Sequence, residues 1–281
     1  MSSTAVMLKN LCEFIAENSL MKKYQINRSW QDWASSMEDS EEIKKRAKTE
    51  PGDRFYLCLS DLQLWMEKNF AGQKGAVLDY GCGGSPYRHL VPEASYKRAD
   101  VEGLSNLDYV VHPDLPLEAP DCCFDAVIST QVLEHVADFQ SYLKDCCRLL
   151  KPGGRLLLTT HGSFEDHGMP HDYYRWTGFG LHRELELAGL NVIKINKLTV
   201  GPRYLIHVIE GLVGSTSSGK SGIFSLPFGL LRVLMRQRPL IQRLHEWTNL
   251  NFSSYRITGN DEERAFRSYV GLALEAQKPV T

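Results

Sequence analysis

The stretch Ala76-Val77-Leu78-Asp79-Tyr80-Gly81-Cys82-Gly83-Gly84-Ser85 decides the fold of this chain. It begins as a short apolar run and continues as a glycine-rich turn, in which the backbone can bend tightly and approach a ligand. In an open parallel sheet, ligands bind beyond the carboxyl ends of the strands. Asp100 follows Asp79 by 21 residues, at the end of a second expected strand, where a carboxylate can accept both hydroxyls of a ribose. These residues predict an adenosine-containing ligand.

Short apolar runs alternate with helical stretches over much of the chain, which is typical of parallel βα units. Helices are expected over residues 139–150, where Lys151-Pro152-Gly153-Gly154 ends the pattern, and over residues 177–188. We predict an α/β fold with a Rossmann-like, seven-stranded mixed sheet, helices on both faces and an antiparallel last strand. The expected strands are residues 76–80, 96–100, 107–111, 124–129, 155–160, 191–198 and 268–276.

Two further segments frame the expected sheet. Residues 1–70 are predicted to form a helical N-terminal cap, which either packs on the core or acts as a lid over the site. Residues 71–281 are predicted to form the cofactor-binding domain, with an insertion at residues 201–265 before the last strand. The cap and the insertion are both expected to cover the cleft.

Composition excludes several classes of protein. Of 281 residues, 43% are hydrophobic and 23% are charged, which is close to the average for globular domains and argues against disorder. The net charge of −2 argues against a general nucleic-acid binder. The seven cysteines are odd in number and include no CxxC, so we expect free thiols and a cytoplasmic setting. We expect neither a signal peptide nor a membrane span.

Two ligand classes compete for the glycine turn. A dinucleotide fold needs a third glycine that opens a helix, but Pro86 stands at that position. Asp79 at the start of the turn would also place a negative charge near a pyrophosphate. An acidic residue suits a ligand with a cationic amine better.

With these features the chain resembles the class I methyltransferases that use S-adenosylmethionine (SAM), of the type 11/12-like kind. The resemblance covers roughly residues 74–200 and the terminal strand. The matching motifs, in the order and spacing of the family, are Val77 to Gly83, Asp100, Asp114-Leu115-Pro116-Leu117, Phe124-Asp125-Ala126-Val127-Ile128, Val132-Leu133-Glu134-His135-Val136 and Leu149-Leu150-Lys151-Pro152-Gly153-Gly154.

The resemblance assigns residues to each part of SAM. Val111 and His112 depart from the family, since many relatives carry an aspartate there, so Asp114 can instead be a turn residue beside Pro113 and Pro116. The implied contacts are Asp79, Gly81 and Gly83 with the amino acid part, Asp100 with the ribose, Asp114 and Leu115 with the adenine, and Thr130 and Gln131 with the methionine part.

Three histidines, His161, His167 and His171, follow the fifth expected strand. Three histidines can bind a metal, but their spacing matches no helix face, so we expect no metal site. Methyl transfer to oxygen needs a base that removes the hydroxyl proton, and histidine is suited to that near neutral pH. His171 and His167 are the candidate bases.

Arg175 has two interpretations. It can anchor an anionic substrate, on which Tyr173 or Tyr174 would stack. Alternatively, Asp172 and Arg175 form a structural ion pair, and Thr177 caps the following helix.

The segment His171-Asp172-Tyr173-Tyr174-Arg175-Trp176-Thr177 also resembles a subgroup of bacterial methyltransferases, many of which are encoded among genes for surface glycans or natural products. This resemblance implies O-methylation of a small molecule or a glycan, without nucleic acid. The alternatives are a protein or RNA methyltransferase and a non-catalytic regulatory subunit with the SAM fold.

The insertion contains two further patterns. Residues 214–221 match the phosphate-binding loop G-x-x-x-x-G-K-[ST], but Pro227 interrupts the helix that should follow, so we interpret them as an ordinary flexible loop. Residues 211–245 carry five basic and no acidic residues among apolar ones. This basic segment is a helical cap with solvated arginines, a peripheral membrane contact, or a surface that binds an acidic substrate or a second copy.

Overall fold

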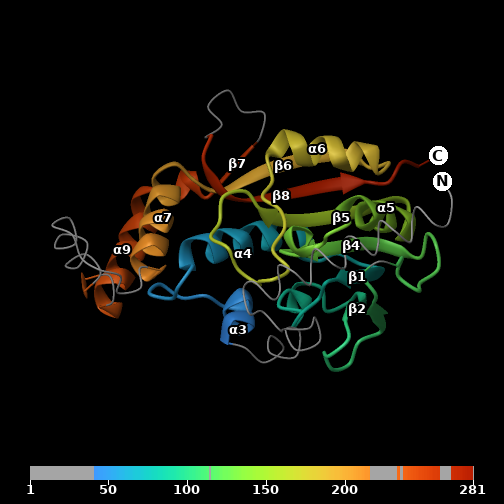
Figure 1. Cartoon of the computed structure of the whole chain (residues 1–281), viewed down its shortest axis with the longest axis horizontal. Helices are drawn as coiled ribbons and strands as arrows, with labels where there is room; N and C mark the ends of the chain where they lie inside the picture. The colour runs from blue at the N-terminus through green and yellow to red at the C-terminus, as the bar shows by residue number, and fades with distance from the viewer. Residues whose placement is uncertain (1–40, 114, 216–232, 235–236, 260–266, 281) are drawn as a thin grey trace.

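The structure is a computed structural model that describes residues 41–113, 115–215, 233–234, 237–259 and 267–280. It places one twisted sheet at the centre, with helices packed on it and a helical pair, α7 (Gly201–Ser215) and α9 (Arg238–Asn251), at one end (Figure 1). The predicted cap residues 1–40 lie outside the described part of the chain, as do residues 216–232 of the insertion.

The sheet is mixed, as predicted, and has the strand order β3-β2-β1-β4-β5-β8-β6-β7. Strands β3, β2, β1, β4 and β5 run parallel to one another, whereas β8 is antiparallel to both β5 and β6. The strands are β1 (Ala76–Tyr80), β2 (Ser95–Val101), β3 (Tyr109–Val111), β4 (Phe124–Thr130), β5 (Leu150–His161), β6 (Asn191–Val200), β7 (Ile257–Gly259) and β8 (Tyr269–Gln277).

The sheet has eight strands instead of the predicted seven. The additional strand is β7, which lies in the predicted insertion and pairs antiparallel with residues 196–198 of β6. Three residues are too few to show the period-2 alternation by which a strand is recognised in a sequence. The pairing with β6 therefore creates this strand, and the local pattern does not predict it.

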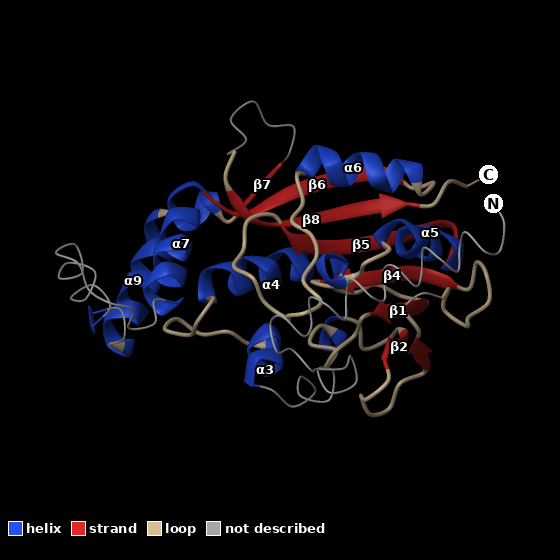
Figure 2. Cartoon of the chain, in the orientation of Figure 1, coloured by secondary structure: helices blue, strands red, loops and turns tan. Residues whose placement is uncertain are grey.

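Helices cover both faces of the sheet, as predicted (Figure 2). The expected helices at residues 139–150 and 177–188 are found as α5 and α6. The described helices are α3 (Glu41–Ala47), α4 (Tyr56–Phe70), α5 (Phe139–Leu149), α6 (Gly178–Leu187), α7 (Gly201–Ser215) and α9 (Arg238–Asn251), with the 3₁₀ turns η1 (Arg88–Leu90), η2 (Leu133–His135) and η3 (Ser253–Tyr255).

Two apolar cores flank the sheet because successive residues of a strand point to opposite faces. Leu78 of β1 packs in the core that includes Leu143 of α5 and Leu181 of α6. The neighbouring Val77 packs on the other face, in the core that includes Trp65 of α4. Helix α4 therefore packs on the core of the sheet, which is one of the two roles predicted for the N-terminal cap.

A buried ion-pair network connects α4 to the end of the sheet. The carboxylate of Asp61 accepts hydrogen bonds from Arg203 (2.8 and 3.0 Å), Arg256 (2.6 Å) and Thr199 (2.8 Å). Asp61 and Arg203 are fully buried, so loss of either one would leave an unpaired charge in the core. The network holds α7, in the insertion, against the cap helix α4.

The described residues also bear on the two patterns of the insertion. Helix α7, and not a strand, leads into the phosphate-loop match, while residues 216–221 of that match lie outside the described residues. In the part of the chain that the structure describes, no helix combines the length and the apolar composition required to span a bilayer.

Candidate functional site

A cavity of about 760 Å³ opens at the carboxyl ends of the parallel strands. The chain proceeds from β1 through β2 to β3 on one side and then returns to β4 on the other side, and this reversal is where open α/β sheets bind ligands. The cavity wall includes the predicted residues Gly81, Gly83, Asp100, Leu115, Thr130, Gln131, His167 and His171.

The glycine turn after β1 forms one wall of the cavity. Gly81 has a φ of +81°, and a Cβ built on it would lie 2.4 Å from a methyl group of Val132. Any side chain would therefore collide with the segment after β4. The N–H of Gly81 donates to the carbonyl of Ala99 (2.8 Å), which ties the turn to β2.

Asp100 braces the same turn from the end of β2. One carboxylate oxygen accepts a hydrogen bond from the N–H of Gly83 (2.7 Å), and the other accepts one from the N–H of Val101 (2.8 Å). Burial raises the pKa of Asp100, and these two N–H groups oppose the increase. Each oxygen keeps a second lone pair, so the carboxylate can still accept hydroxyl donors from the cavity.

Asp79 lies apart from the cavity wall, although it begins the turn. Its side chain is buried and accepts a hydrogen bond from the hydroxyl of Tyr96 (2.5 Å). Burial raises the pKa of Asp79 to about 7. Its predicted contact with the cofactor stays a prediction. Asp114 lies outside the described residues, and its neighbour Leu115 is 62% exposed.

Thr130 and Gln131 stand at the end of β4 and line the cavity, as the sequence analysis expected. Gln131 has a φ of +56°, and its side-chain N–H donates to the hydroxyl of Thr159 (3.1 Å). Its Oε1 is buried and has no hydrogen-bond partner among the described residues. The site thus holds a fixed acceptor that an ammonium group can satisfy.

Histidines form another part of the cavity wall. His167 and His171 are both in the wall, and burial lowers the pKa of each to about 4, assisted by the neighbouring His135. A hydrogen bond of 3.1 Å joins Nδ1 of His171 to the hydroxyl of Tyr173, which also lines the cavity. Both imidazoles are therefore neutral near pH 7 and can accept a proton.

Arg175 is engaged within the protein. Its guanidinium donates to both carboxylate oxygens of Asp172 (2.6 and 2.7 Å) and to the carbonyls of Phe164, Glu165 and Tyr174. These bonds occupy all five of its N–H donors. The geometry therefore favours the structural ion pair over the anion anchor. Thr177 caps α6, as the same interpretation predicts, by accepting a hydrogen bond from the N–H of Gly180 (3.1 Å).

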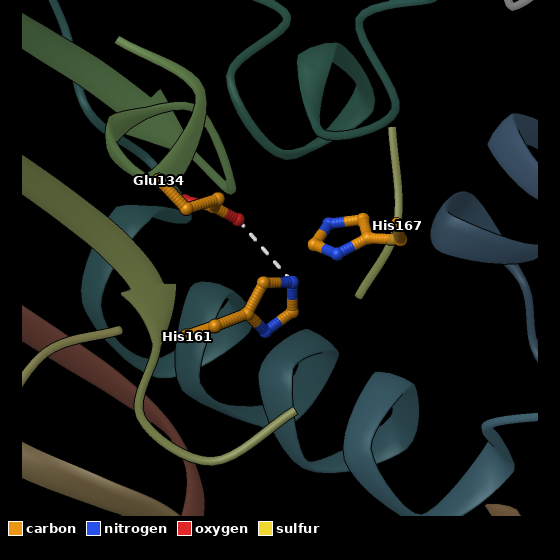
Figure 3. Close-up of side chains that lie close together, drawn as sticks. All are labelled: Glu134, His161 and His167. Carbon is orange, nitrogen blue, oxygen red and sulfur yellow. Dashed lines mark ion pairs between the residues drawn. The ribbon is translucent and has the colours of Figure 1, made fainter. Parts of the chain in front are cut away.

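The structure places two further residues, His135 and Glu134, in or beside the cavity wall. His135 lines the cavity, and its Nδ1 lies 2.6 Å from the carbonyl of His171. Glu134 is fully buried behind it, with Oε1 at 3.2 Å from Nε2 of His161 (Figure 3). In the sequence, both residues stand out only as part of a family motif. Their place just after a strand that ends at the cavity is the signal that would have identified them.

Comparison with protein families gives one match that spans half of the chain. A family model described as a methyltransferase domain matches residues 52–195. The matched range includes β1 to β5 and the glycine turn, together with Asp100 and the histidine loop.

Curated relatives match over shorter stretches. A ubiquinone biosynthesis O-methyltransferase from Maricaulis maris is 37% identical over 34% of this chain and 42% of its own length. Another from Parvibaculum lavamentivorans is 28% identical over 44% of this chain and 62% of its own length. The chain thus spans less than two thirds of the length of these relatives.

A solved structure supports the fold. A SAM-dependent methyltransferase from Thermotoga maritima aligns with a TM-score of 0.51 and 13% identity, over 89% of this chain and all of that one. The family match, the strand order of the sheet and the position of the cavity all agree with the resemblance to class I methyltransferases in the sequence. The chain belongs to the class I methyltransferase family, whose cofactor is S-adenosylmethionine.

Proposed function

We propose that this chain transfers the methyl group of SAM to an oxygen atom of a small molecule or glycan. One observation carries the proposal: the glycine turn and Asp100, which we call the first end, line the same cavity as His135, His167 and His171, which we call the second end. A cofactor held at the first end would present its methyl group toward neutral histidines at the second.

The residues at the first end fit SAM. Val132 leaves no room for a side chain on Gly81, so the main chain of the turn itself lines the cavity, and the buried Oε1 of Gln131 can accept a hydrogen bond from the ammonium group of the methionine part. The carboxylate of Asp100 keeps lone pairs for ribose hydroxyls. We propose contacts for Gly83, Leu115 and Thr130 from their places in the wall, and for Asp79 and Asp114 from the family pattern alone.

When bound, SAM supplies a methyl group activated on a sulfonium. The protein's main contribution is to align the acceptor oxygen behind that methyl group. As the oxygen–carbon bond forms and the carbon–sulfur bond breaks, the hydroxyl proton passes to a base. His171 is our first candidate for this base and His167 the second, because both are neutral and line the cavity.

The relatives support oxygen as the acceptor atom, since those at 37% and 28% identity are named O-methyltransferases. Arg46 of α3 lines the same cavity and adds a positive charge near the proposed acceptor. An acceptor with an acidic group next to its hydroxyl fits this end best. The engaged guanidinium of Arg175 leaves Arg46 as the better cation for that group.

The first test is calorimetric titration with SAM, with ATP and NAD as controls. We expect binding of SAM alone. Labelled SAM is then incubated with the chain and two acceptors, a catechol carboxylic acid and an acidic sugar, and the methylated atom is found by NMR. Methyl transfer to nitrogen or carbon would overturn the choice of oxygen, and absence of SAM binding would overturn the proposed function.

A further inference from the structure

A tight group of metal-ligating side chains lies beside the cavity, and His167 is the member of the group that lines it. Ligand atoms of Glu134, His161 and His167 all lie within 4.8 Å of one another. Figure 3 shows the three side chains converging from separate segments. Glu134 follows β4 in η2, His161 ends β5, and His167 belongs to the loop that precedes α6.

Two of the potential metal-ligating atoms of this group are buried and make no hydrogen bond to the described residues. Oε1 of Glu134 and Nε2 of His167 have no hydrogen-bond partner among the described residues. The contact of Oε1 is an ion-pair distance of 3.2 Å to Nε2 of His161. Glu134 is 0% exposed, so no bulk water satisfies its carboxylate. Buried polar atoms without partners carry a cost, which a ligand in their midst would remove.

We propose that Glu134, His161 and His167 bind one divalent transition-metal ion, such as Zn²⁺ or Co²⁺. Two imidazoles and one carboxylate are ligands that zinc, cobalt and iron(II) accept, whereas Mg²⁺ and Ca²⁺ prefer oxygen ligands alone. In the tetrahedral geometry of zinc sites, donors about 2.1 Å from the ion lie about 3.4 Å apart, so the widest pair of the group would move closer by about 1.4 Å.

Outer partners hold these ligands in place, as metal sites require. The hydroxyl of Thr160 donates to Oε2 of Glu134 (2.8 Å), which leaves Oε1 for the ion. Nδ1 of His167 lies 3.6 Å from Oδ2 of Asp172, and the N–H of His167 donates to the same oxygen (2.9 Å). Arg175 in turn fixes Asp172 and neutralises its charge. The hydrogen bonds of Arg175 thus help to hold His167 in position, through Asp172.

A metal here would join η2, the end of β5 and the histidine loop into one rigid wall of the cavity. This inference goes beyond methyl transfer and shares only His167 with the proposed function. If His167 ligates the ion, His171 is left as the base. The spacing of the histidines argued against a metal, but it could not reveal that Glu134 would complete the set.

The test is metal binding by the full chain, independent of catalysis. Protein stripped with a chelator is titrated with Co²⁺ and followed by visible absorption, and Zn²⁺ is titrated by calorimetry. We expect one equivalent of each metal to bind. Glu134→Gln and His167→Gln should each weaken binding at least about 100-fold, beyond the cost of losing an outer partner. His182→Gln removes an exposed histidine paired with Glu186, and should change nothing.

SAM binding and thermal unfolding of each variant report whether it is folded. His167→Gln alters a loop at the cavity wall, so it tests the site even if Glu134→Gln unfolds the core. Absence of Co²⁺ and Zn²⁺ binding in the parent protein would overturn the proposal, as would undiminished binding in His167→Gln or loss of binding in His182→Gln. If the parent protein does not bind SAM, the proposed function is rejected, whether or not the protein binds a metal.

Discussion

At the cofactor end of the cavity, main-chain groups of one turn and one carboxylate define the wall, whereas at the histidine end side chains from several segments meet. Gly81 and Gly83 are held by hydrogen bonds to Ala99 and Asp100 on the adjacent strand. The histidine end depends on rings such as that of Phe164, which stacks on His161 (4.1 Å) and on His207 (5.6 Å). The first end is set by local backbone geometry, and the second by packing between distant parts of the chain.

The largest expected effect of a substitution is a decrease in kcat at His171, which would separate the histidine end from the cofactor end. If His171 is the base, His171→Gln should lower kcat roughly 10²–10⁴-fold and leave SAM binding unchanged. Turnover is measured with labelled SAM and the accepted substrate, and SAM binding by calorimetry. The control, His89→Gln, changes an exposed histidine after the glycine turn and should retain full turnover. An equal loss in both variants would remove His171 from the mechanism.

At the cofactor end, Gly81→Ala should weaken SAM binding about 100-fold, or about 3 kcal/mol. The added Cβ would collide with Val132, and the backbone would be strained at a φ of +81°. Gly72→Ala is the matched control, because Gly72 has a φ of +75° but no atom within 4 Å of the added Cβ. The backbone of Gly72→Ala would be strained in the same way, but at a position outside the cavity wall. Tight SAM binding by Gly81→Ala would show that the turn does not shape the cofactor site.

The packing of the histidine end predicts a dependence of stability on pH. Burial lowers the pKa of His207 to about 4, from 6.5, so at pH 5 the unfolded chain takes up a proton that the folded chain resists. His207 should therefore destabilise the fold by about 2 kcal/mol as the pH falls from 7 to 5. In urea unfolding, the stability lost between pH 7 and pH 5 should be about 2 kcal/mol smaller for His207→Asn than for the parent protein, whereas the surface variant His182→Asn should lose as much as the parent. A pH-independent difference between His207→Asn and the parent protein would contradict the burial argument.

The smallest expected effect is at Asp100. Asp100→Asn keeps the shape but replaces a charged acceptor, so SAM binding should weaken about tenfold, or about 1.4 kcal/mol. The effect should fall mainly on KM for SAM. Asp108→Asn is the control, since Asp108 directly precedes β3 and pairs with Lys97 of β2 (2.8 Å) without lining the cavity. If both variants bind SAM equally well, Asp100 only stabilises the glycine turn and does not contact the cofactor.

Much of the sheet could be predicted because its signals are local. The apolar run before Gly81 specified β1, and the proline–glycine pair at Pro152 and Gly153 marked the end of α5. The antiparallel last strand was also predicted correctly. Strand β7 was not, because three residues carry no periodic pattern and only pairing with β6 makes them a strand.

The sequence by itself determined the class of fold and the position of the cofactor turn, because glycines, apolar alternation and the spacing to Asp100 act over short stretches of chain. Only the tertiary structure decided that Arg175 is fully engaged by Asp172 and main-chain carbonyls, and that Asp79 lies against Tyr96. It alone brought Glu134 to His161 and His167. Which side chains meet depends on the order and register of strands distant in sequence, and no local pattern encodes that order.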